Sequence, residues 1–437
     1  MGPTGCVQPT CRVAVSPSEN WIRSGPSGET VRVTSPPTKL AVVSHVLPPS
    51  WSGQAVMLHR LLRAWDARDY CLISIQDYTK NAPYTHTATD VLPGAFFHLP
   101  REVPRFTFNV GGRLGRAAAR FSSLVMRSVD RARNIAAIAK NQRCSAILAC
   151  SGDGIDIPAA FLAALFTKRP FYVYLFDDYV YQWQDRLLRF FAAFCSRAIL
   201  RNTKCVIVPN EFLAKDYARR YGVEPVVIRN PSEGPGSGDA ADVPWPENDG
   251  EIKIVYTGSV YQAHYDAFRN LVAAMKLLQP TNFKLHLYTA QTQETLEREG
   301  ICGSVVLHGH LPNTEILAVQ SRSDILFLPL AFESPCPQVI NTSAPGKMGE
   351  YLVAGRPILV HAPAESFVSW YFRKHQCGTV VDRSDPTELV KAIQRICADG
   401  CYREKLSVKA RERFAADFNV FVVQGQFRRL FETDADV

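Results

Sequence analysis

Short apolar runs alternate with segments of helical spacing in the first half of the chain. The pattern begins at Lys39 with KLAVVSHV, a run of strand type. A loop, LPPSWSG, follows it, and QAVMLHRLLRAW then repeats apolar residues every three or four positions. Further runs predict strands at CLISIQ, AILAC, FYVYLF, CVIVP and PVVIRN, whereas the segment from Asn81 to Val110 is expected to be irregular. Strands alternating with helices are typical of βαβ units and a parallel sheet.

The same alternation returns in the second half, after a break. Residues 231–250, PSEGPGSGDAADVPWPENDG, are rich in Gly, Pro and acidic residues and predict a linker. Strand-like runs then recur at IKIVYTG, KLHLYTA, SVVLHG, DILFLPL, RPILVHA and GTVVD. Two such series predict an α/β protein of two Rossmann-like domains, whose parallel sheets face an interdomain cleft. Ligands of such sheets bind beyond the carboxyl ends of the strands.

These breaks define the expected domains. Residues 1–37 are rich in Pro, Ser, Gly and Thr and predict a disordered leader. We expect the first domain at 38–230, the linker at 231–250 and the second domain at 251–415. Residues 416–437 are expected to form a C-terminal helix that crosses back to the first domain.

The net charge of +8 is concentrated in one stretch, between Arg101 and Arg143. Its cations are Arg101, Arg105, Arg113, Arg116, Arg120, Arg127, Arg131, Arg133, Lys140 and Arg143, against Glu102 and Asp130 alone. Such a surface attracts an anionic membrane or a lipid diphosphate, although an ordinary solvated helix face carries the same pattern. No nucleic-acid motif accompanies the charge, so nucleic acid is not an expected partner.

Cysteine spacing and hydropathy bear on the compartment. The 12 cysteines are scattered, with neither a Cys-x-x-Cys pair nor zinc spacing, which indicates reduced thiols rather than disulfides or a metal site. The first residues lack the apolar run of a secretory signal. The most apolar stretches, Ala159–Phe166 and Phe190–Leu200, are shorter than the roughly 20 residues of a membrane span. We therefore expect a cytoplasmic protein, or one peripheral at the inner face of the plasma membrane.

The stretch most informative about chemistry is SAPGKMGEYLVAGRPILVH, from Ser343 to His361. Lys347 to Val353 is predicted to form a short helix that ends at Gly355. The free amides and positive dipole at its start favour a bound phosphate, and Lys347 adds a full charge there. Glu350 lies one turn on and can accept hydrogen bonds from ribose hydroxyls. The alternative is an ordinary helix start with an exposed Lys and a Glu bonded to the backbone.

At this stretch the chain resembles the retaining glycosyltransferases of family four, which have the GT-B fold. Pro-x-Lys-x-x-Glu-Tyr-Leu-x-x-Gly-x-Pro is similar to their donor-site signature. KLAVVSHVLPPSWSGQAVMLHRLLRAW resembles their opening strand, acceptor loop and first helix, and IKIVYTGSV resembles the first strand and phosphate loop of their donor domain. VVLHGHLPNTEILAVQSRSDILFLPL resembles the family's strand, Gly turn, helix and Asp-led strand.

The resemblance implies that Lys347 and Glu350 act on the donor, a nucleotide-diphosphate sugar that is a substrate rather than a cofactor. The donor-binding residues that it implies are Gly258, Ser259, His264, Gly309, His310, Gly346 and Met348. On the acceptor side it places Gly53, which lets the acceptor loop approach the phosphates. Asp177 and Asp178 follow a strand end and are expected to face the cleft. The bland alternatives are a packed or surface histidine at 264, a loop histidine at 310, a turn glycine at 53 and solvated or helix-capping acids at 177 and 178.

The chain departs from the family in two places. The first glutamate of the family's donor region falls on Thr342, so the ribose role carries over to Glu350 alone. Many relatives place Arg directly after the loop glycine and Lys shortly after, where this chain has Ser259 and Tyr261. Lys347 and His264 remain as side chains for the leaving-group charge.

We therefore expect a metal-independent, retaining glycosyltransferase without a cofactor, acting on a glycan, lipid-linked or small-molecule acceptor. No acidic cluster has the spacing of a Mg²⁺ or Mn²⁺ site, so positive groups are expected to stabilise the departing nucleoside diphosphate. Three alternatives stay open: a GT-B-type sugar-nucleotide epimerase, a non-catalytic subunit of a glycan assembly complex, and a basic peripheral-membrane binding protein.

Overall fold

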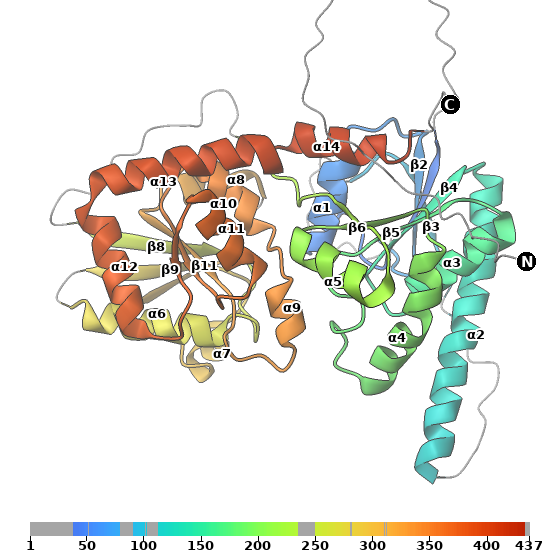
Figure 1. The fold of residues 1–437 in the computed structure, drawn as a ribbon, viewed down its shortest axis with the longest axis horizontal. Coiled ribbons are helices and arrows are strands. Elements are labelled where there is room, and N and C mark those ends of the chain that lie inside the picture. Colours follow the sequence, from blue (N-terminus) through green and yellow to red (C-terminus); the bar gives the residue numbers. More distant parts are fainter. Residues whose placement is uncertain are drawn as a thin grey trace, which may run out of the picture.

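Two α/β units, each built on a parallel sheet, make up the computed structural model (Figure 1). The structure describes residues 38–50, 52–78, 91–100, 102, 112–234, 250–279, 282–309, 311 and 313–432. The predicted α/β class with two Rossmann-like domains is confirmed. Within the described part of the chain, none of the helices combines the length and the apolar character that crossing a bilayer requires.

The first domain is a seven-stranded parallel sheet in the order β3-β2-β1-β4-β5-β6-β7. Its strands are β1 (Leu40–Val43), β2 (Tyr70–Ser74), β3 (Ala95–His98), β4 (Ala146–Cys150), β5 (Phe171–Tyr174), β6 (Cys205–Val208) and β7 (Val226–Val227). Its helices are α1 (Gly53–Leu62), α2 (Gly112–Asn141), α3 (Asp156–Thr167), α4 (Arg186–Arg201) and α5 (Glu211–Tyr221). Strand β3 lies in the segment expected to be irregular, so that expectation was wrong for four residues.

The second domain is a six-stranded parallel sheet in the order β10-β9-β8-β11-β12-β13. Its strands are β8 (Ile252–Thr257), β9 (Phe283–Tyr288), β10 (Val305–His308), β11 (Ile325–Pro329), β12 (Ile358–His361) and β13 (Thr379–Val381). Its helices are α6 (Tyr265–Leu277), α7 (Gln293–Arg298), α8 (Asn313–Ser321), α9 (Pro337–Asn341), α10 (Lys347–Ala354), α11 (Phe367–His375), α12 (Pro386–Ala398) and α13 (Gly400–Arg413). A π-helix (Phe414–Phe418) leads from α13 into α14 (Val420–Arg429).

The central strands of each sheet, such as β1 and β11, are buried on both faces, which explains why they are apolar along their length. In β1, Ala41 and Val43 join one core cluster, whereas Leu40 and Val42 join the cluster on the opposite face. All four are at most 1% exposed. Side chains of a strand alternate between faces, so a doubly covered strand must be apolar throughout.

Helix α14 returns from the second domain and packs on the first (Figure 1). Val423, Phe427 and Phe431 belong to the same buried cluster as Leu40 and Tyr172. The Gln424 side-chain amide also donates to the backbone oxygen of Arg60 at 2.6 Å.

Further contacts join the domains beside the linker. The side-chain amide of Asn210 donates to Thr342 O at 2.8 Å, and that of Asn230 donates to Ala344 O at 2.7 Å. The Phe212 ring lies 5.4 Å from the ring of Trp370. These contacts hold the segment that leads into α10 against the first domain.

Candidate active site

Helix α10 and the loop after β8 meet through Lys347. Gly258 has φ +117°, a conformation that L side chains rarely adopt. A Cβ placed there would lie 2.7 Å from Cε and 2.8 Å from Nζ of Lys347, so only glycine lets the lysine cross the loop. The Tyr351 hydroxyl accepts from Thr257 N at 3.2 Å and fixes the next turn of α10 to the end of β8.

The Lys347 ammonium is a half-buried cation that forms no ion pair within the described residues. It lies 5.0 Å from the centre of the Tyr256 ring, whose face attracts a cation. The amides of Lys347 and Ser259 also make no hydrogen bond to the described part of the chain, and Ser259 is exposed. This corner therefore offers a positive charge and free donors to an anion.

Two expected donor contacts are corrected here. The Gly258 amide donates to Tyr288 O at 2.7 Å, so it is not free for a phosphate. Met348 is fully buried in the core, and its amide donates to Pro345 O at 3.0 Å. Gly258 serves the site by its shape, and Met348 by anchoring α10.

Glu350 sits in a network that spans the domains. Its Oε1 accepts from Arg60 Nη2 of α1 at 3.0 Å, and its Oε2 lies 3.4 Å from Gln320 Nε2 of α8. Gln320 Nε2 also donates to Thr257 Oγ1 at 2.9 Å, while Arg60 Nη1 donates to Pro231 O at 3.0 Å. The carboxylate retains further lone pairs that can accept from hydroxyls. Sequence reasoning missed both Arg60 and Gln320.

His264 cannot supply the positive charge expected of it. Burial, with the nearby Lys347 charge, lowers the pKa of His264 to about 3, so the ring is neutral at pH 7. The ring centre lies 4.5 Å from that of Tyr261 and 5.9 Å from that of Tyr256. Its buried Nδ1 has no hydrogen-bond partner among the described residues. His264 is a packed histidine beneath the loop.

On the opposite wall, α1 begins at Gly53, one turn before Met57. The Ser52 hydroxyl caps this helix by accepting from Ala55 N at 3.3 Å. A Cβ on Gly346 would lie 3.2 Å from Met57 Cε, so the start of α10 faces α1. Gly53 is exposed, and a Cβ there would meet nothing within 4 Å. The start of α10 and the first turns of α1 therefore lie against each other at the domain boundary.

Asp177 and Asp178 have different surroundings. Asp178 is fully buried: it forms an ion pair with Arg220 and accepts from the amides of Val180 and Tyr181, each at 2.9 Å. The expectation that it faces the cleft was therefore wrong. Asp177 is half-buried, and burial together with the Asp178 charge raises its pKa to about 6.

Asp177 faces the second domain. Burial and the nearby charge of Asp177 raise the pKa of Tyr261, which follows the loop of Gly258. A carboxyl of raised pKa that borders a cleft is typical of a functional position.

The two remaining expected donor residues follow β10. Gly309 is exposed, and a Cβ there would meet nothing within 4 Å. His310 lies outside the described residues. The structure therefore brings Lys347, Gly258, Ser259, Gly346 and Glu350 together, while Gly309 stands apart from their contacts.

The basic stretch is in part structural. Arg131 is fully buried and pairs with Glu102, Asp153 and Asp156 at 2.5, 2.7 and 2.6 Å. Arg127 also pairs with Glu102, at 3.3 Å. The exposed cations of α2 are thus fewer than the sequence implied, and Arg101 and Arg105 lie outside the described residues.

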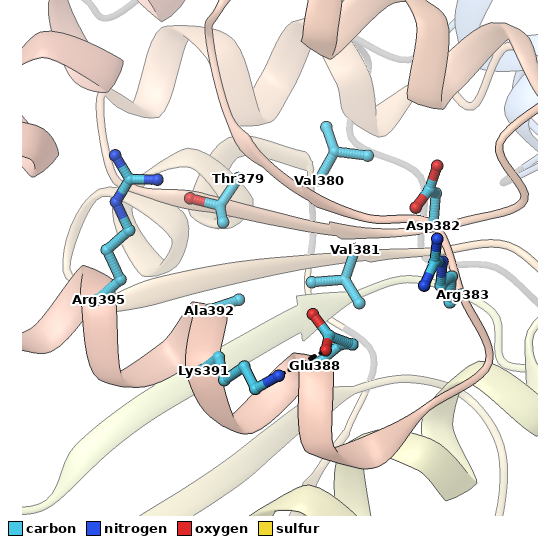
Figure 2. Close-up of a pocket in the computed structure, with 9 residues that line it drawn as sticks. All are labelled: Thr379, Val380, Val381, Asp382, Arg383, Glu388, Lys391, Ala392 and Arg395. Atoms are coloured by element: carbon cyan, nitrogen blue, oxygen red, sulfur yellow. Dashed lines mark hydrogen bonds and ion pairs between the residues drawn. The ribbon is translucent and has the colours of Figure 1, made fainter.

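A separate cavity of about 370 Å³ lies beside β13 and α12 (Figure 2). Three of its charged residues are already paired, Lys391 Nζ with Glu388 at 2.7 Å and Asp382 with Arg373, while the Arg395 guanidinium lies 3.9 Å from the centre of the Tyr402 ring. No expected site residue lines this cavity. In the described ranges, no group of three or more His, Cys, Asp or Glu side chains is placed to hold a metal ion.

The second domain resembles a known family. Residues 251–399 match the family described as Glycosyl transferases group 1. No curated protein matches the chain.

Solved structures resemble the whole chain. A glycosyltransferase from Rickettsia africae is 13% identical with a TM-score of 0.62, and the match covers 90% of this chain and 98% of that one. Sucrose-phosphate synthase from Thermosynechococcus elongatus is 17% identical with the same score and coverages. HepE from Anabaena, in complex with UDP and glucose, is 14% identical with a TM-score of 0.59, covering 91% of this chain and all of that one.

These similarities establish a GT-B fold and support a glycosyltransferase, as the sequence predicts.

Proposed function

We propose that the protein transfers a sugar, with retention and without a metal, from a nucleoside-diphosphate sugar to a glycan, lipid-linked or small-molecule acceptor. The observation that carries this proposal is the Lys347 ammonium, which has no ion pair among the described residues and lies across Gly258, at the start of a helix whose Gly346 approaches α1 of the other domain. A diphosphate bound there would meet that cation and the free amide of Ser259. HepE, a structural neighbour, was solved with UDP and with UDP-glucose, which favours a donor of this class.

In the proposed reaction the bond between the anomeric carbon and the phosphate oxygen breaks, and the nucleoside diphosphate leaves with the electron pair. The acceptor oxygen attacks the same face of the sugar, and its proton passes to the leaving phosphate. Negative charge grows on the diphosphate as the bond breaks. The Lys347 ammonium and the amides of Lys347 and Ser259 stabilise that charge in place, which lowers the barrier.

Glu350 is proposed to hold the ribose while it remains paired with Arg60. Ribose hydroxyls would donate to the lone pairs that Arg60 and Gln320 leave open. In this arrangement, donor binding adds hydrogen bonds to a network that already joins both domains.

Thermal unfolding in the presence of UDP-, GDP-, ADP- and dTDP-sugars tests the donor class. A donor at about 100 times its dissociation constant adds about 2.7 kcal/mol of stability. Glu350→Ala should lose most of that gain, whereas the matched variant Glu388→Ala, at a side chain of α12 that is 41% exposed, should keep it. Equal gains in both variants would refute the ribose role.

Turnover separates the remaining alternatives. A transferase needs acceptor and, if metal-independent, keeps its rate in excess chelator. Conversion of the sugar nucleotide without acceptor would support the epimerase. Failure to bind any nucleoside diphosphate at millimolar concentration would support a non-catalytic subunit.

A further inference from the structure

Helix α4 turns two phenylalanines to solvent. Phe190 and Phe194 are 61% and 66% exposed, although the adjacent Phe191 is buried in the domain. Arg186 lies four positions before Phe190 and Arg197 three positions after Phe194, so both arginines share the helix face of the two rings. Both arginines are exposed and form no ion pair with a described residue. The outer face of α4 thus carries two exposed aromatic rings with an exposed arginine on each side.

Helix α2 extends this outer face. Leu114, Phe121 and Val125 follow the spacing of one helix face, and Leu114 is 89% exposed. The Phe121 ring lies 6.0 Å from the ring of Phe190 and 5.8 Å from that of Phe194. The apolar faces of both helices therefore form one surface, which we call the α2–α4 face. Figure 1 shows the two helices side by side, on the side of the first domain away from α14.

The charge of the α2–α4 face is positive. Arg113 and Arg116 are exposed beside Leu114 and pair with none of the described residues. Helix α4 contains no acidic residue. Asp130 in α2 and Asp185 before α4 are already neutralised, by Arg133 at 3.1 Å and Arg120 at 2.7 Å.

We propose that the α2–α4 face docks the protein on the surface of an anionic lipid bilayer. Helices that lie in the membrane interface bury an apolar stripe below the headgroups and keep cations at headgroup level. Phe190, Phe194 and Leu114 supply the stripe here, and the flanking arginines meet the negative surface potential. The inference rests on the proposed function in one respect: a docked enzyme would take a lipid-linked acceptor from that bilayer.

The position of the face suits such an acceptor. Arg189, in the first turn of α4, reaches the second domain, where its Nη2 lies 3.4 Å from Cys336 Sγ just before α9. Helix α4, which carries half of the docked surface, therefore also reaches the boundary between the two domains.

Charge distinguishes a bilayer from a second copy of this chain as the occupant. A symmetric contact through this face would oppose exposed arginines to exposed arginines, because the described residues of the face include no unpaired carboxylate. A membrane rich in anionic lipid instead complements both parts of the surface.

Sedimentation of the full chain with vesicles tests the proposal. We expect binding to phosphatidylcholine vesicles with about one-third phosphatidylglycerol, and much weaker binding to phosphatidylcholine alone. Phe190→Ser with Phe194→Ser should weaken partitioning at least about tenfold, because two exposed rings no longer enter the interface. Arg186→Gln with Arg197→Gln should weaken binding to the anionic vesicles only.

The matched control changes Phe421 and Val422, which are 75% and 39% exposed on α14, to serine. This control should bind as the wild type does. Equal binding by all variants, or concentration-dependent dimerisation through the face without vesicle binding, would overturn the proposal. UDP-sugar affinity, measured without lipid, should be unchanged in the Phe190/Phe194 variant. A chain that binds vesicles but no donor would refute the transferase while leaving the docking surface intact.

Discussion

Lys347→Met gives the sharpest test of the site. Methionine retains the unbranched apolar stem that crosses Gly258 and removes only the charge. Two unit charges 4 Å apart interact by about 4 kcal/mol at an effective dielectric constant of 20. After desolvation, a hydrogen bond to a charged group contributes about 1.5–3 kcal/mol. The variant should therefore bind a nucleoside diphosphate about 10 to 150 times more weakly.

Isothermal titration with the nucleoside, its monophosphate and its diphosphate measures this effect. The loss should be small for the nucleoside and largest for the diphosphate, because only the phosphates meet the ammonium. Lys391→Met is the matched control, since that lysine is exposed on α12 and pairs with Glu388. It should leave all three affinities unchanged.

An internal reporter accompanies the assay. The Lys347 charge contributes to the lowered pKa of His264, so the pKa of that ring should rise in Lys347→Met. Histidine NMR shifts then show whether the ammonium lies where the structure places it. Unchanged diphosphate affinity together with a raised His264 pKa would refute the phosphate role while leaving the geometry correct.

Three further predictions concern the neighbouring groups. Arg60→Met should lower the free energy of unfolding, measured in urea, by about 2 kcal/mol. This value lies between those of exposed and buried ion pairs, because the Arg60 and Glu350 side chains are 8% and 22% exposed. Additive effects in a double-mutant cycle with Glu350→Gln would contradict an interaction between the two side chains. Asp177 is protonated below its raised pKa of about 6, so if it contacts the acceptor, kcat/KM should fall below pH 6 in the wild type and lose that limb in Asp177→Asn; an identical limb in both would exclude the residue. Because the pKa of His264 is about 3 in the folded protein, only the unfolded chain takes up this proton between pH 6.5 and 3, so this contribution to stability is complete above pH 6.5 and falls below it. At pH 5 the loss is about 2 kcal/mol. His264→Gln should therefore reduce the difference between the free energies of unfolding at pH 7 and pH 5, measured in urea, by that amount.

The apolar runs of the sequence predicted the strands that are covered on both faces of their sheet. The run at β1 is apolar throughout, and that at β8 is apolar at Ile254, Val255 and Tyr256, because these parts of the strands lie between two core clusters. Strand β3 was not predicted because Ala95–His98 lies at the sheet edge, where its side chains are exposed or only half-buried. A short edge strand needs neither an apolar run nor strict alternation.

The site was predictable where its residues share one helix start and one loop. Lys347 was found from the phosphate chemistry of a helix start, whereas Gly258 was found through the family resemblance of the loop after β8. Arg60 was not, since it reaches Glu350 across 290 positions of sequence. A signal was available: Arg60 occupies an inward position of α1, next to the buried Leu61, and a charge there implies a buried partner.

The acidic pair shows the same limit. Asp178 was expected to face the cleft, but it pairs with Arg220, which lies 42 positions later in the sequence. Its neighbour Asp177 lies near Tyr261 of the second domain. Which of two adjacent carboxylates is neutralised depends on a helix that packs from elsewhere in the chain.

The return of α14 has a consequence for how the protein is made. Val423, Phe427 and Phe431 complete a core cluster of the first domain whose other buried members lie between Leu40 and Ile228. At about 5–20 residues per second, the ribosome needs about 10–40 s more to deliver them. Until then Trp65 and Tyr172, which Phe431 finally covers with ring centres 5.8 and 4.7 Å away, stay uncovered in the nascent chain. The first domain to be translated is therefore the last to be completed, and a chain cut short before Val420 should be a client for chaperones rather than a smaller enzyme.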